Sequence, residues 1–139
     1  MACCHPPAQV RCPLAEVLTH WVQGDVAPAV EMIGLQLAGL GIATSYDCRP
    51  RNSVIGAKLS EHATGDAIDL YELTLTNGQS LVLTDMSVDR ALRRELAQSA
   101  CRRFTTVLGP GSDAYHEGHI HLDLLQRRGG YRTCQWDVR

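Results

Sequence analysis

Two short stretches of this sequence contain residue types that bind metal ions. Segment 60–69 joins His62 to Asp69, seven residues later, through a turn that contains a glycine. Such a turn can fold both side chains back toward one point. The second stretch, at 119–121, reads His-Ile-His, so its two imidazoles project from the same face of a strand. One imidazole can then bind a metal ion while its neighbour reaches a water on that ion.

Two histidines and one carboxylate leave one position open on a tetrahedral zinc ion, which distinguishes a catalytic zinc site from a closed structural one. The metal lowers the pKa of water bound at that position to near neutrality. It also polarises a carbonyl group, so the expected chemistry is hydrolysis. Each part alone is weak evidence, because His-x-His is common in strands and Asp69 can also cap a strand end. Together, with Ser60 and Gly65 at their offsets, the parts predict a metal site. Lone histidines such as His5 and His20 are expected to have no such role.

The elements that must position these residues follow from hydrophobic periodicity and turn signals. Helices are predicted at 14–22, from about 27 to 40 and at 88–104, and strands at 42–48, 66–76, 80–83 and 119–125. The longest helix is expected to be capped near Ser87 or Asp89. An Asn-Gly pair at 77–78 lies between two of the strands and is a strong hairpin signal, so the sheet is at least partly antiparallel.

Length and composition limit the fold and the class of partner. With 139 residues the chain has the size of one domain, and we expect an irregular lead-in at 1–11, containing Cys3 and Cys4, before one domain at 12–139. The net charge of -2 argues against nucleic acid as a partner. The longest apolar stretch, at 27–43, is interrupted by polar residues and glycines, so no transmembrane segment is expected.

The cysteines indicate an oxidising compartment. Four of them, Cys12, Cys48, Cys101 and Cys134, are spread along the chain without a C-x-x-C pair, which disfavours a cysteine zinc site and favours disulfides. They allow three pairings, of which we predict Cys12 with Cys134 and Cys48 with Cys101; the alternative is that some are simply small buried side chains. No leader is visible at Met1, so the protein is either cytosolic or has an export signal outside this sequence.

The motifs taken together resemble a known group of proteins. The pattern S-x-H-x-x-G-x-A-x-D at 60–69, followed by H-x-H at 119–121, is similar to the signature of the zinc D-Ala-D-Ala carboxypeptidase, murein endopeptidase and hedgehog-type superfamily. Four segments more closely resemble the bacterial extensin-like C-terminal family: SYDCRPRN at 45–52, LSEH at 59–62, FTTVLGPG at 104–111 and HIHLDL at 119–124. The likeness runs from about Cys12 to Cys134, and the family name implies no activity on plant extensins.

This resemblance implies an α+β fold with a small antiparallel sheet flanked by helices, as in hedgehog domains and DD-peptidases. It also implies hydrolysis of peptide bonds in peptidoglycan stem peptides, with one zinc ion held by His62, Asp69 and His121. We therefore expect a monomer in the periplasm or cell envelope that acts on the stem peptides of the cell wall.

The resemblance also suggests catalytic roles. His119 matches the second histidine, which contacts the water or the oxyanion. Arg49 matches an arginine that holds a substrate carbonyl or carboxylate, a task that suits a planar guanidinium. The alternative is that Arg49 is a solvated loop residue without a role in the site. Ser60 is expected to orient the substrate, and His116 to assist.

One departure from the pattern leaves the general base open. Gly118 stands where relatives usually carry an acidic residue, and Glu117 stands one position earlier. The base is therefore Glu117 or His119, and it must reach the water within about 3 Å, directly or through a second water.

Three readings of the function stay open from the sequence. The first is a peptidase, either an endopeptidase on a cross-link, which we favour, or a D,D-carboxypeptidase on a terminal D-amino acid. The second is a domain that binds peptidoglycan or a protein partner without turnover. The third is an exported domain whose metal only stabilises the fold.

Overall fold

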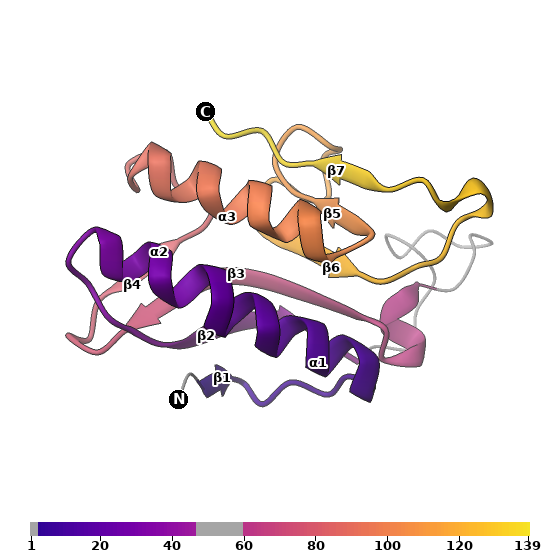
Figure 1. Ribbon diagram of the computed structural model, residues 1–139, viewed down its shortest axis with the longest axis horizontal. Helices are drawn as coiled ribbons and strands as arrows, with labels where there is room; N and C mark the ends of the chain where they lie inside the picture. The colour runs from indigo at the N-terminus through magenta and orange to yellow at the C-terminus, as the bar shows by residue number, and fades with distance from the viewer. Residues whose placement is uncertain (1–2, 47–59) are drawn as a thin grey trace.

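The computed structural model describes residues 3–46 and 60–139 (Figure 1). The predicted substrate arginine, Arg49, and the predicted disulfide cysteine Cys48 lie outside these residues. The seven strands are β1 (Cys3–His5), β2 (Leu37–Thr44), β3 (Ala67–Leu75), β4 (Ser80–Val82), β5 (Thr106–Leu108), β6 (Ile120–Asp123) and β7 (Thr133–Gln135).

The strands form one mixed sheet in the order β1-β2-β3-β6-β5-β7, with β4 paired to β3. The α+β class is confirmed, and the sheet is partly antiparallel as the hairpin signal predicts, but it is a larger, mixed sheet than the small antiparallel one that the resemblance implies. The pairs β1–β2 and β5–β7 are parallel, whereas all other pairs are antiparallel. Both parallel partners are three-residue strands, too short for alternation to reveal. Because β1 lies within the predicted lead-in, that segment is not irregular throughout.

The helices begin with α1 (Cys12–Trp21), which continues through a π-helical turn, η1 (Val22–Val26), into α2 (Ala27–Met32). In α1, the buried residues Leu14, Leu18 and Trp21 follow helical spacing, as predicted. The prediction that the next helix runs to about residue 40 is wrong. The helix ends before Gly34, which has φ 79, and Leu37 and Leu40 beyond it belong to β2.

The third helix, α3 (Arg90–Arg103), confirms the amphipathic helix predicted at 88–104. Asp89 caps it, because its carboxylate accepts a hydrogen bond from the N–H of Leu92 at 2.8 Å. Figure 1 shows the helices gathered in one layer on the sheet. In that layer the rings of Trp21 and Phe104 meet edge to face at 5.7 Å between centroids.

The helix layer covers only one face of the sheet's central strands. Where β3 pairs with β6, the side chains that point into the core have no exposed surface: Ile68, Leu70, Ile120 and Leu122. Because side chains alternate along a strand, the residues between them point to the opposite face. Those residues include Asp69, His121 and Asp123, so the fold itself separates the core from the polar residues of interest.

A disulfide between Cys101 and Cys134 joins α3 to β7. Because Cys101 and Cys134 pair with each other, the predicted pairings of Cys12 with Cys134 and of Cys48 with Cys101 are wrong. Cys12 is instead a free, exposed thiol at the start of α1. The cause is tertiary, since β7 returns to the sheet beside β5 and so lies next to the end of α3.

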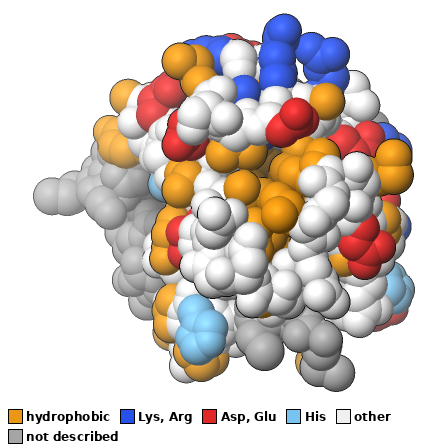
Figure 2. Space-filling view, turned by 90° about the vertical axis from the view of Figure 1, so that its left-hand side faces the viewer, with side chains coloured by type: hydrophobic (Ala, Val, Ile, Leu, Met, Phe, Trp, Pro, Cys, Tyr) orange, Lys and Arg blue, Asp and Glu red, His pale blue; other side chains and the backbone are white. Residues whose placement is uncertain are grey.

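The two ends of the molecule differ in chemistry. Figure 2 shows the end formed by α2 and β4, where apolar side chains gather. Met32, Ile33 and Met86, which follow or end these elements, are exposed. The helical turn η3 (Glu61–Thr64) lies at the other end (Figure 1).

Within the described residues, no helix has the length and apolar character needed to cross a bilayer.

Candidate metal site

The first two candidate ligands are positioned by a short turn that leads into β3. The hydroxyl of Ser60 accepts a hydrogen bond from the N–H of His62 at 3.2 Å and so caps η3. Gly65, with φ 73, ends the turn in the left-handed conformation that glycine favours. The N–H of Arg11 donates to its carbonyl at 2.8 Å. The chain then enters β3, whose third residue is Asp69, so the serine and glycine of the motif shape the turn between the two ligands.

The third candidate ligand comes from the neighbouring strand. Asp69 of β3 and His121 of β6 are directly opposite each other in the antiparallel pair. Opposite residues in such a pair have Cβ atoms roughly 5 Å apart, close enough for their side chains to meet. The register of the sheet therefore brings together two residues that are 52 positions apart in the sequence.

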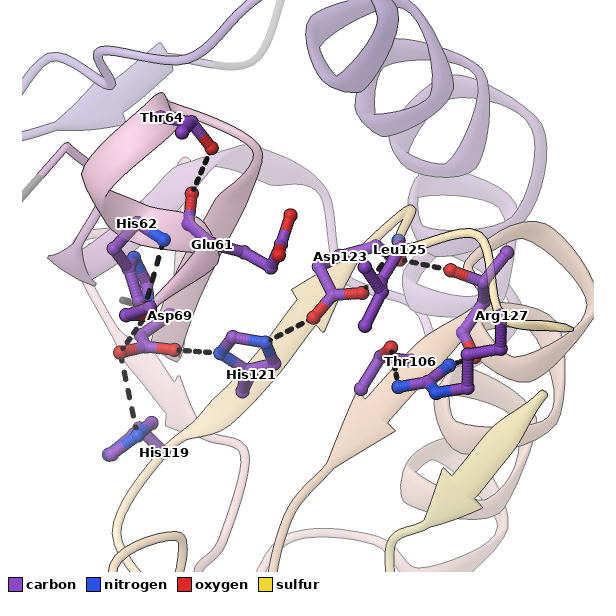
Figure 3. A network of polar contacts seen from close by, with 12 residues as sticks. Glu61, His62, Thr64, Asp69, Thr106, His119, His121, Asp123, Leu125 and Arg127 are labelled. Atoms are coloured by element: carbon purple, nitrogen blue, oxygen red, sulfur yellow. Dashed lines mark hydrogen bonds and ion pairs between the residues drawn. The ribbon is translucent and has the colours of Figure 1, made fainter. Parts of the chain in front are cut away.

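The three side chains converge on one point (Figure 3). His62 Nε2 lies 3.2 Å from Asp69 Oδ2, and His121 Nδ1 lies 3.1 Å from Asp69 Oδ1. One ligand atom from each of the three residues lies within 4.8 Å of the others, and all three residues are buried. This is the arrangement of a site that closes around a single ion.

Both imidazoles are oriented in the way a metal ligand requires. His62 Nδ1 lies 2.6 Å from the carbonyl oxygen of Ser45, which only accepts hydrogen bonds, so Nδ1 carries the proton. The lone pair of Nε2 therefore points into the site, where this buried atom has no hydrogen-bond partner. A buried polar atom without a partner is destabilising, and a cation coordinated there would satisfy it. The donor set of two histidines and one carboxylate fits a zinc ion.

His121 is held from its other side by a fourth residue. Its Nε2 lies 2.7 Å from Asp123 Oδ2, which leaves Nδ1 directed at Asp69. Outer carboxylates of this kind fix the ring orientation and tautomer of metal-bound histidines. The second oxygen of Asp123 accepts a hydrogen bond from the N–H of Leu125 at 2.9 Å, so Asp123 is itself fixed.

The electrostatics favour positive charge at this point. Burial opposes charge on His121, yet hydrogen bonds with Asp123 and Asp69 raise its pKa to about 9 in the metal-free protein. Burial also opposes the charge on Asp69, but the hydrogen bond with His121 and the adjacent imidazole of His62 hold its pKa well below its ordinary value. The pKa of Asp123 is lowered in the same way, mainly by His121. Two buried carboxylates thus stay ionised and surround a place for a cation.

The candidate ligands line a cleft of about 370 Å³. Its walls include several of the predicted site residues and some that were not predicted: Ser60, Glu61, His62, Asp69, Thr106, Leu108, Asp113, Tyr115, His116, His119, His121, Asp123, Leu125 and Arg127. His119 Nε2 lies 3.6 Å from Asp69 Oδ2, beside the ligand cluster. Burial lowers the pKa of His119, an effect that Asp69 partly opposes.

His116 belongs to a second polar pair in the cleft wall. Its Nδ1 lies 2.7 Å from Asp113 Oδ1, and its ring is 5.2 Å from that of His119 and 5.8 Å from that of His121, measured between centroids. Hydrogen bonds with His116 and with the N–H of Tyr115 lower the pKa of Asp113, although burial opposes this. The pair places a carboxylate-oriented imidazole next to His119.

Glu117 points elsewhere. Its carboxylate accepts a hydrogen bond from the N–H of Gly111 at 3.1 Å and lies 3.8 Å from Arg139 Nη1. It is not among the residues that line the cleft. Of the two residues predicted to be the general base, the structure therefore places only His119 beside the candidate ligands.

Asp123, Asp113 and Arg127 are among the residues of the site that the sequence analysis missed. Asp123 continues the alternation of the H-x-H motif, so the pattern H-x-H-x-D at 119–123 was the signal for it. Asp113 precedes His116 by three residues within one loop, a weaker signal. Arg127 offered no local signal, because only the folding of the chain after β6 brings it to the cleft.

Comparison with known proteins gives a distant similarity to a curated protein and a match to a family. The chain is similar to a gamma-glutamyl phosphate reductase from Kosmotoga olearia, with 24% identity over 140 residues that cover 97% of this chain but 32% of that protein. The chain thus spans about a third of the length of that relative. No solved structure matches. The family model described as Extensin-like protein C-terminus matches residues 2–135, nearly the whole chain, and the protein therefore belongs to that family.

Proposed function

We propose that this protein is a zinc-dependent hydrolase that cleaves a peptide bond in peptidoglycan stem peptides or their cross-links. The observation that carries the proposal is the buried cluster of His62, Asp69 and His121 at the wall of an open cleft. Three protein ligands leave a coordination position for water or substrate, and the cleft gives a peptide access to it. The choice of peptidoglycan rests on the motifs that the chain shares with peptidases acting on that polymer.

The residues around the cluster have separate tasks in this proposal. His62, Asp69 and His121 would hold the zinc ion, while the carbonyl of Ser45 and the carboxylate of Asp123 keep the two imidazoles in place. When bound, the ion supplies a Lewis acid and a water acidified to near neutral pH.

His119 is the group best placed to move protons. It lies beside Asp69 and lines the cleft, whereas Glu117 is engaged with Gly111 and Arg139. We assign it the removal of a proton from the attacking water and the delivery of that proton to the departing amine. A side chain 27% exposed, like that of His119, can still meet a substrate that enters from solvent.

The pair of Asp113 and His116 is assigned to the substrate. In its imidazolium form His116 donates one N–H, from Nδ1, to Asp113 and can donate the other, from Nε2, to the carbonyl oxygen on which negative charge develops. Ser60 is less suited to direct contact than predicted, because its hydroxyl already caps η3. Its contribution is to fix the backbone that carries His62.

The experiment is to incubate zinc-loaded protein with purified muropeptides and to identify the products by mass spectrometry. Products of cross-link cleavage support the endopeptidase, and loss of one terminal D-amino acid supports the D,D-carboxypeptidase. A chelator should abolish the activity and added zinc should restore it. His119→Ala should remove most of the activity, whereas His20→Ala, an exposed histidine of α1, should leave it unchanged.

Two results would contradict hydrolysis. Metal-loaded protein that binds cross-linked muropeptides without cleaving them would indicate a binding domain. A chelator that unfolds the protein, combined with no cleavage by the loaded form, would indicate a metal that serves only stability.

A further inference from the structure

Arg127 is a charged residue that has no task in the proposed mechanism. Arg127 lines the same cleft as the candidate zinc ligands. Among the described residues it forms no ion pair with a carboxylate. A cationic side chain that lines the cleft without a carboxylate partner is a candidate binding group for an anionic part of the substrate.

Within the part of the chain that the structure describes, the guanidinium of Arg127 is held by neutral groups. Its Nη2 donates to the hydroxyl of Thr106 at 2.6 Å, and its Nη1 donates to the carbonyl of Thr105 at 3.1 Å. The ring of Tyr131 lies 5.5 Å from its Cζ, which adds a cation–π contact. These contacts orient the group but leave its charge. An arginine side chain has five N–H donors, so three remain for a ligand.

The nearest carboxylate by strand register does not neutralise Arg127. Asp123 lies opposite Thr106 in the pairing of β5 and β6. However, one of its oxygens faces His121 Nε2 and the other accepts the N–H of Leu125. Both oxygens therefore already have hydrogen-bond partners on the metal side of the cleft, and among the described residues Asp123 forms no ion pair with Arg127.

The sheet register gives an approximate distance between the guanidinium of Arg127 and the cluster of candidate metal ligands. Asp123 is two residues beyond His121 on β6, which corresponds to about 7 Å along an extended strand. Thr106 is level with Asp123, and the guanidinium lies a further 2.6 Å from its hydroxyl. Figure 3 shows Asp69, His121, Asp123, Thr106 and Arg127 following one another across the sheet, with His119 on the other side of Asp69. The charge is thus roughly 7 to 10 Å from the cluster, away from His119.

We propose that Arg127 anchors a free carboxylate of the substrate peptide, about two residues from the scissile carbonyl. An extended residue spans roughly 3.5 Å, so a terminal carboxylate only one residue away falls short of this position. A carboxylate on a side branch, or at a chain end two residues along, reaches it. This inference rests on the proposed function and makes Arg127 a specificity-determining residue of the same cleft.

The test compares two matched peptides in the zinc-loaded protein. One carries a free carboxylate two residues from the scissile bond, and the other carries a carboxamide there. For Arg127→Gln we expect the KM of the carboxylate peptide to rise about 10- to 100-fold, as expected for losing a charged hydrogen-bonded contact, with kcat nearly unchanged. The KM of the carboxamide peptide should change little. The exposed neighbour Arg128→Gln should behave as wild type with both peptides.

Two results would overturn the role of Arg127 as an anchor. If wild type and Arg127→Gln show the same preference between the two peptides, Arg127 is not an anchor. A parallel loss on both peptides, together with a lower Tm, would mean that Arg127 only supports the loop that contains Tyr131.

A failure of the proposed function can be told apart from a failure of the anchor. If zinc-loaded wild type cleaves neither peptide, the hydrolase proposal fails. Calorimetric binding of the two intact peptides to wild type and Arg127→Gln then tests the anchor alone. Weaker binding of only the carboxylate peptide to the variant supports the anchor, and equal binding overturns it.

Discussion

The two faces of strands β3 and β6 carry side chains of opposite chemistry, although both faces belong to the same pair of strands. Toward the helices lie fully buried apolar side chains: Ile68, Leu70, Ile120 and Leu122. On the other face, Asp69 and Asp123 are 3% exposed and His121 is 9% exposed, so this face is almost as dry but is polar. Burial of charged groups is tolerated when they pair with one another or with a metal ion.

The comparison shows that the core and the candidate site share one geometric requirement. Side chains alternate between the faces with a period of two, so a shift of one residue in the pairing of β3 with β6 would exchange the two sets. The apolar set strongly disfavours such a shift, because it would expose the leucines and isoleucines to water. Packing on the helix face thereby sets the position of Asp69 opposite His121.

The largest effect is expected from a change on the polar face. His121→Ala removes a zinc ligand and should lower hydrolytic activity by about 1000-fold or more, since the metal supplies both the Lewis acid and the acidified water. Zinc content, measured by mass spectrometry of the purified protein, should fall in parallel. The far-ultraviolet circular dichroism should stay that of the wild type. Full activity in this variant would rule out the proposed zinc site.

The neighbouring residue on the apolar face should give the converse result. Leu122→Ala leaves a cavity beneath the helices and should lower the free energy of unfolding by about 3 kcal/mol, measured by urea denaturation. Zinc affinity at low temperature, where the variant stays folded, should remain within a few-fold of the wild type. A large loss of zinc affinity in the folded variant would show that the two faces are not independent.

A smaller effect is expected behind the metal ligand. Asp123→Asn keeps the shape of the side chain but removes the carboxylate that orients His121, so zinc affinity should weaken about 10- to 100-fold. Competition with a chromogenic chelator measures this affinity without any substrate. Asp85→Asn, an exposed aspartate after β4, is a matched control that should bind zinc normally. If both variants bind zinc equally well, Asp123 does not position His121.

The smallest effect is expected in the helix layer. Asp89→Ala removes the cap of α3 and should lower the free energy of unfolding by about 1 kcal/mol, because the N–H of Leu92 loses its partner. Thermal unfolding measures the change. Activity at temperatures well below unfolding should not change, since α3 packs against the face of the sheet away from the cleft. An altered KM would indicate that the helix layer influences the cleft.

Local signals explain which elements were predicted correctly. The spacing of Leu14, Leu18 and Trp21, and the hairpin between β3 and β4, each depend on residues close together in the sequence. The end of α2 was misjudged because the apolar run at 30–40 satisfies helical spacing while its second half forms β2. The strands β1, β5 and β7 were missed because three residues carry no periodicity.

The same division holds for the candidate site. The motif at 60–69 contains its own cap, turn and strand start, so the placement of His62 relative to Asp69 is largely a local matter. The orientation of Glu117 toward Gly111, and the approach of Arg127 to Thr106, depend on loops that fold against the sheet. No spacing rule describes such contacts, so Glu117 was predicted as a base and Arg127 was not considered.

The sequence by itself determined which residue types meet, because a histidine, an aspartate and a His-x-His strand carry both their chemistry and their alternation in the order of the chain. Only the tertiary structure decided what surrounds them: the pairing of Cys101 with Cys134, the carboxylate behind His121 and the guanidinium at the end of the cleft. The physical reason is that these contacts join segments brought together by sheet register and core packing. Such contacts depend on the burial of the whole apolar face rather than on any local run of residues.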